Sequence, residues 1–133
     1  MSSKAMSRIV GVILMVTLVV LISATGFYFY RIGVYQSIVA EIVVTTPDLG
    51  AVEDGTYQGS FDAFEVAATV EVAVKDHKIT AITILRHKTD RGRKAEVITA
   101  EVITAQSLQV DTISGATNSS KVILKAIEMA LEQ

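Results

Sequence analysis

An uncharged apolar run from Ile9 to Tyr30 is the feature that most limits what this chain can fold into. Its 22 residues would form a helix roughly 33 Å long, enough to cross a hydrocarbon core of about 30 Å. The run ends in aromatic residues followed by Arg31, an order typical of the boundary between lipid and water. We therefore expect a transmembrane helix at residues 9–30, with a signal sequence cleaved after Ala24 as the alternative.

The charges on either side of this run predict its orientation. Lys4 and Arg8 precede it, whereas residues 31–133 carry 10 basic and 14 acidic side chains. Positively charged flanks stay in the cytoplasm. Residues 1–8 are therefore predicted to be a cytoplasmic tail of a single-pass protein in the cell membrane, and the C-terminal part is predicted to be extracytoplasmic.

The rest of the chain is predicted to form a juxtamembrane spacer, residues 31–52, and one domain, residues 53–133. Alternating apolar residues from Phe64 to Val74 indicate a half-buried strand. The remaining expected elements are a strand at 56–61, a turn at 75–78, a strand at 79–85 with Ile82 and Ile84 inward, and helices at 93–106 and 120–131. This order predicts the α+β class, with a small antiparallel sheet and two helices on one side.

The composition excludes several kinds of chemistry. The chain has no Cys and two His, which excludes disulfides, thiolate catalysis and iron–sulfur clusters and argues against a metal centre built from side chains. The net charge is −2, and the basic residues are not interleaved with aromatic ones, so nucleic acid is not an expected partner. No catalytic residue is predicted.

The segment from Asp111 to Ser120 carries the strongest chemical signal. Six of its ten side chains bear a hydroxyl or a carboxylate, and it runs into the predicted C-terminal helix. Gly115 and Ala116 are small enough for a ligand to approach the backbone. Free N–H groups at a helix N-terminus, together with hydroxyl groups, can hold a phosphate. Ordinary helix capping is the alternative for the same residues.

The pattern of this segment, D-x-x-S-G-A-T-x-S-S, resembles the covalent flavinylation motif of the FMN-binding domain family. That family includes the flavin-bearing small subunits of Rnf and of the sodium-translocating NADH:quinone oxidoreductase. The runs D-G-T-Y-x-G at residues 54–59 and K-I-x-x-I-x-I at residues 78–84 are similar to two of the family's strands. The likeness covers residues 53–133. Where larger members have an acidic-Thr-Pro-Gly loop, this chain has a basic loop at residues 86–94. Its basic residues could pair with the flavin phosphate, contact a partner or face lipid headgroups, and a solvated loop is the alternative.

The resemblance implies that the hydroxyl of Thr117 is esterified to the phosphate of FMN. It also implies which residues seat that phosphate: Ser114, Gly115, Ala116, Ser119 and Ser120. Asp111 matches the acidic position of the motif, where it is either read by the modifying enzyme or forms a turn. A threonine hydroxyl does not attack a phosphoanhydride unaided, so the implied maturation partner is the family's magnesium-dependent flavin transferase, which uses FAD.

The function implied by the resemblance is a membrane-anchored, extracytoplasmic electron carrier. Such a protein would relay electrons between subunits of a membrane redox complex and an external acceptor. Two alternatives remain open. One is a flavin-dependent reductase with its own substrate, although the sequence has no nicotinamide-binding fingerprint. The other is a structural subunit in which the motif is only a helix cap.

Overall fold

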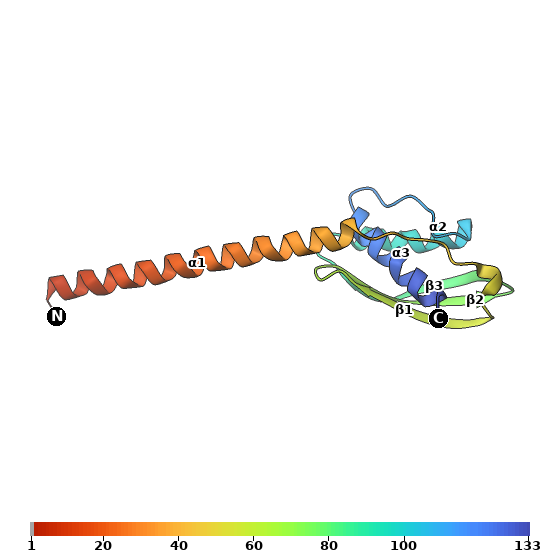
Figure 1. Ribbon diagram of the computed structural model, residues 1–133, viewed down its shortest axis with the longest axis horizontal. Helices are drawn as coiled ribbons and strands as arrows, with labels where there is room; N and C mark the ends of the chain where they lie inside the picture. Colours follow the sequence, from red (N-terminus) through yellow and green to blue (C-terminus); the bar gives the residue numbers. More distant parts are fainter. Residues whose placement is uncertain (1) are drawn as a thin grey trace. The chain divides into compact units, whose positions relative to one another are not determined.

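The computed structural model describes residues 2–133 and divides them into two compact units, which meet between Val34 and Tyr35. Helix α1 runs over Ser3–Ala40 (Figure 1). Most of it, up to Val34, belongs to the first unit, and its last turns, from Tyr35, belong to the second. The helix is long and apolar enough to cross a membrane, with a mean hydropathy of 2.6 over its most apolar stretch. A signal sequence would pass the same test of length and composition.

The second unit contains a three-stranded antiparallel sheet in the order β1-β2-β3. Its strands are β1, Gly55–Asp62; β2, Ala67–Lys75; and β3, Lys78–Lys88. The alternation predicted for the central strand is confirmed, because Ala68, Val70, Val72 and Val74 are buried. This strand starts at Ala67 rather than at Phe64, since Phe64 lies in a turn with a φ of 74° and donates its N–H to Asp62 Oδ1.

The hairpin between β2 and β3 sets how β3 faces the core. Asp76 and His77 both have positive φ, as the tight turn of a two-residue hairpin requires. The register shifts between Ala73 and Val74. Ile79 is the fully buried residue of β3. Ile82 and Ile84 face inward as predicted, because they pair with the buried Val72 and Val70 and pack half-buried against the core.

Two helices cover one face of this sheet, which confirms the α+β class. A 3-10 turn, η2, Arg93–Val97, leads into α2, Ile98–Ala105, and the last helix is α3, Thr117–Leu131. Helix α3 packs on β1 and β2, and α2 packs on β3 (Figure 1). The apolar face predicted for α3 is buried throughout: Val122, Ile123, Ala126, Ile127, Ala130 and Leu131. In α2 only Ala105 departs from the predicted buried face, because the helix ends there.

Helix α3 lies unusually close to β1, and Gly59 makes this possible. A Cβ atom at Gly59 would overlap the backbone oxygen of Ala126 and the backbone nitrogen of Ala130. Backbone atoms cannot move aside as a flexible side chain can. Any residue larger than glycine at this position would therefore push the helix off the sheet.

A buried carboxylate ties the segment after α1 to the middle of the domain. Glu128 is 2% exposed and accepts hydrogen bonds from Thr45 N–H at 3.0 Å and Thr45 Oγ1 at 2.5 Å. Lys125 Nζ lies 2.6 Å from Glu128 Oε2 and donates to Val43 O. Burial disfavours the charged form of Glu128, but the bonds from Lys125 and Thr45 outweigh it and hold the pKa of Glu128 below its ordinary value.

These contacts join the segment after α1 to the same compact unit as the sheet, which begins at Tyr35. Thr46 adds to them, since its Oγ1 accepts the N–H of Leu108 at 2.9 Å. Most of the spacer predicted at residues 31–52, from Tyr35 onward, therefore belongs to the same compact unit as the sheet. Their polar contacts reach residues more than 60 positions away, so no local pattern in the sequence indicates them.

Glu128 should make the domain sensitive to acid. Its folded-state pKa lies below the ordinary value of 4.5, so its stabilisation is complete above that value and is lost as the pH falls through the folded-state pKa. We expect Glu128→Gln to lower the free energy of unfolding near neutral pH by about 1–3 kcal/mol. The variant should also lose less further stability on acidification than the wild type.

Urea denaturation at a series of pH values measures both effects. Glu132→Gln is the matched control, because Glu132 is exposed and is expected to change neither quantity. Equal losses on acidification in the wild type and in Glu128→Gln would show that another group causes the acid sensitivity.

Candidate functional site

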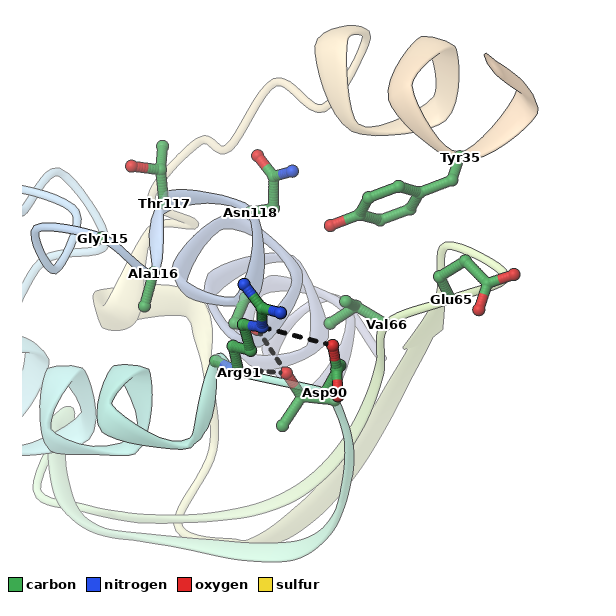
Figure 2. Close-up of a pocket in the computed structure, with 12 residues that line it drawn as sticks. Tyr35, Glu65, Val66, Asp90, Arg91, Gly115, Ala116, Thr117 and Asn118 are labelled. Carbon is green, nitrogen blue, oxygen red and sulfur yellow. Dashed lines mark hydrogen bonds and ion pairs between the residues drawn. The ribbon is translucent and has the colours of Figure 1, made fainter. Parts of the chain in front are cut away.

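A pocket of about 410 Å³ lies at the N-terminal end of α3, within the second unit (Figure 2). Its wall is formed by the start of α3 with the loop before it, by the loop after β3 and by the turn between β1 and β2. Tyr35, from the last turns of α1, completes the wall. The lining residues are 115–119, 89–92, Glu65, Val66 and Tyr35. Its volume lies in the range of about 300–1,000 Å³ that is common for small-molecule sites.

Helix α3 begins at this pocket without a side-chain cap. The residue at the N-cap position is Ala116, which has no side chain able to accept a hydrogen bond. The first backbone bond of the helix runs from Ser120 N–H to Ala116 O at 2.9 Å. Within residues 2–133, the N–H groups of Thr117, Asn118 and Ser119 therefore have no acceptor. The capping alternative does not describe this helix end.

The motif hydroxyls that face inward hold the loop in place. Ser120 is fully buried; its Oγ accepts the N–H of Ile113 at 3.0 Å and donates to Ala116 O at 2.9 Å. Ser119 Oγ lies 3.2 Å from Thr89 Oγ1, which in turn accepts the N–H of Gly92. These two serines therefore fix the motif to α3 and to the loop after β3.

The motif hydroxyls that face outward have no partner in the described part of the chain. Thr117 and Ser114 are exposed, and neither side chain makes a hydrogen bond there. Thr117 lines the pocket, whereas Ser114 does not. Asp111 is also exposed and lies beside a different groove, with residues of α2. The structure thus gathers Gly115, Ala116, Thr117 and Ser119 at the pocket and leaves Asp111 apart.

A lysine side chain lies against the loop that precedes Thr117. Gly115 has a φ of +71°, a conformation that favours glycine, and a Cβ atom there would lie 2.6 Å from Lys94 Nζ. Among the described residues Lys94 has no ion pair and no hydrogen bond. Glycine at this position therefore allows an uncompensated ammonium group to approach the start of α3.

The basic segment at residues 86–94 is not the single loop that the sequence predicts. Strand β3 continues to Lys88 and η2 begins at Arg93, so only residues 89–92 form a loop. The His87 side chain is 2% exposed, with its Nδ1 2.9 Å from Glu96 Oε1. Gly92 is also buried, and it packs so closely on Ser119 that a Cβ atom at this position would overlap Ser119 Oγ. The side chain of His87 and the backbone at Gly92 are therefore packed into the domain, whereas the arginine and lysine side chains of the segment are exposed.

The aromatic residue of the pocket comes from outside the motif. Tyr35 lies in the last turns of α1 and is half-buried against the core of the second unit. Tyr57, the aromatic residue of the first strand motif, instead donates its hydroxyl to Glu53 O at 2.8 Å, away from this pocket. In the sequence, Tyr35 lies in the predicted spacer and belongs to a helical stripe with Val34, Ile38 and Ile42, and this pattern does not indicate a ligand site.

Comparison with known proteins identifies the class to which this domain belongs. The model of the family described as "FMN-binding domain" matches residues 64–132, just over half of the chain. This protein is therefore a flavin-binding protein, and the chain belongs to the FMN-binding domain family. An uncharacterized protein of Treponema pallidum (strain Nichols) is 31% identical to it over 84 residues, which are 61% of this chain. The matched region spans 23% of that relative's length.

Two serines of the motif should respond differently to substitution by alanine. Ser120→Ala leaves the partly buried N–H of Ile113 without its acceptor, and we expect it to lower the free energy of unfolding by about 1–3 kcal/mol. Ser114→Ala, at an exposed position, should change it by no more than about 0.5 kcal/mol. Thermal or urea denaturation measures the difference. Equal effects would mean that Ser120 does not hold the loop.

Proposed function

We propose that this chain is a membrane-anchored electron carrier that holds FMN through a phosphoester to Thr117. One observation carries the proposal: the exposed hydroxyl of Thr117 lies at a pocket where three backbone N–H groups have no acceptor in the described chain. That pocket belongs to a domain of the FMN-binding family.

The start of α3 fits the phosphate of FMN. The N–H groups of residues 117–119 and the positive end of the helix dipole favour an anion. Lys94 adds a positive charge on the side of Gly115. Esterification of Thr117 would break no hydrogen bond of the described chain, unlike esterification of the engaged Ser119 or Ser120. This difference supports Thr117 as the attachment residue.

Attachment is proposed to require a separate flavin transferase. Thr117 makes no hydrogen bond to a base in residues 2–133, and a hydroxyl needs a base to attack a phosphoanhydride. The Thr117 oxygen would form a bond to the FMN phosphorus of FAD and lose its proton to a base of the transferase, while the phosphoanhydride bond would break and AMP would leave. Asp111, exposed and away from the pocket, is available to such a transferase.

Substitution at Thr117 tests the attachment. In cells that also express a flavin transferase, we expect Thr117→Ala to abolish the flavin that survives denaturation. Thr117→Ser should retain part of it, since it keeps a hydroxyl. Thr112→Ala is the matched control, because Thr112 is exposed in the same loop but does not line the pocket.

In-gel flavin fluorescence and the intact mass measure covalent loading in these variants. Covalent FMN on the denatured Thr117→Ala protein would disprove the assignment of the attachment residue.

The position of Tyr35 in the chain supports a redox partner in the membrane. Tyr35 lines the pocket and Tyr30 ends the apolar run, so five peptide units separate them. Even a fully extended chain of that length spans at most about 18 Å. Covalent connectivity alone would therefore keep the flavin pocket near the bilayer surface. An FMN held there is suited to exchange electrons with redox subunits in the membrane or with an external acceptor.

Protease added to intact cells tests the orientation. The basic residues Lys4 and Arg8 before the apolar run favour an extracytoplasmic domain. We expect external protease to remove the flavin domain and leave the helix in the membrane. A domain that is digested only after the cells are lysed would reverse the orientation.

Reactivity of the loaded protein tests the carrier function. The second unit has a three-stranded antiparallel sheet and, in the described chain, no parallel βαβ unit of the kind that binds a dinucleotide. We expect dithionite to reduce the flavin, ferricyanide to reoxidise it, and NADH alone to reduce it negligibly. Rapid, saturable reduction by NADH without a second protein would favour the reductase alternative.

A further inference from the structure

Tyr35 places an aromatic ring at the pocket that contains Thr117. Figure 2 shows the ring directed into the pocket from the end of α1, with its hydroxyl toward Asn118 and with Glu65 nearby. Tyr35 belongs to the second unit and packs against that unit's core. Its hydroxyl makes no hydrogen bond within residues 2–133.

The chemistry of the pocket gives this ring a specific use. Among the described residues that line the pocket, Tyr35 is the one aromatic side chain, and the others are polar, charged, aliphatic or glycine. Aromatic rings pack favourably against other planar ring systems in offset or edge-to-face arrangements. Thr117 and Tyr35 line the same pocket of about 410 Å³, so a ring tethered at Thr117 by a flexible ribityl chain can reach Tyr35.

We propose that Tyr35 packs against the isoalloxazine ring of FMN attached at Thr117. This rests on the proposed function, because it takes the attachment at Thr117 as given. Tyr35 lies outside the residues that the family model matches, 64–132. The continuation of the membrane helix therefore contributes directly to the cofactor site of this chain, and the isolated family domain would lack that contact.

Flavin emission from the full-length chain tests this contact. A phenol in contact with a flavin quenches its emission by donating an electron to the excited ring, whereas a phenyl ring does not. We expect Tyr35→Phe, loaded by a flavin transferase and purified in detergent, to emit severalfold more strongly than the wild type at equal flavin content. Tyr35→Leu should emit strongly as well, and its emission should be quenched severalfold more effectively by iodide, because the ring is uncovered.

Ile38→Ala is the matched control. Ile38 lies one turn further along α1 and also packs on the domain, but it does not line this pocket. Its emission should equal that of the wild type, which separates contact with the flavin from loosened packing of the helix. Flavin content is measured by intact mass in every variant.

Each result decides the proposal. Wild-type emission in Tyr35→Phe, an equal rise in Ile38→Ala, or unchanged iodide access in Tyr35→Leu would each overturn the contact. If the wild-type chain carries covalent flavin and Tyr35→Phe emits no more than the wild type, the contact with Tyr35 is contradicted but the proposed function is not. A wild-type chain that acquires no covalent flavin contradicts the proposed function as well.

Discussion

The uncapped N-terminus of α3 is the feature on which the rest of the site depends. Helices usually begin with a side chain that accepts one of the free N–H groups, but here the N-cap residue is alanine. The hydroxyls that follow are either engaged elsewhere, as in Ser119 and Ser120, or exposed, as in Thr117. Three N–H donors and one hydroxyl are therefore left at the pocket, where an anionic group of a ligand can take the place of the missing cap.

The same helix also connects the pocket to the rest of the second unit. Its middle approaches β1 so closely that only glycine fits at position 59. Near its C-terminal end, Glu128 binds Thr45, which follows α1 in the chain. One helix therefore joins the pocket end of the domain, the sheet and the segment that follows α1. Substitutions far from the pocket, at Gly59 or Glu128, would be expected to disturb it through α3.

Much of the fold could be predicted because it rests on local periodicity. The alternating residues of β2 and the apolar face of α3 repeat at the periods of a strand and a helix, and both are buried as expected. Residues of the motif, which are contiguous in the sequence, also lie together in the structure, where Gly115, Ala116, Thr117 and Ser119 line one pocket. By contrast, the bond between Thr45 and Glu128 and the approach of Lys94 to Gly115 join residues far apart in the sequence.

The role of Tyr35 could not be predicted for the same reason. It belongs to a helical stripe that suits a stalk as well as a packed helix, and only the tertiary structure brings it to the pocket. The expectation of a loop at residues 86–94 was wrong at residues 86–88, because these residues pair with β2 and no local pattern indicates that pairing. The His87 side chain lies buried beside Glu96, whereas the arginine and lysine side chains of the segment are exposed.

Mapping the modified residue tests the central claim most directly. Trypsin cleaves after Lys94 and Lys121, which releases the whole motif as residues 95–121. After expression with a flavin transferase, fragmentation of this peptide by mass spectrometry should locate the mass of FMN less one water on Thr117. An unmodified peptide, or FMN located on any other hydroxyl of the segment, would contradict the account.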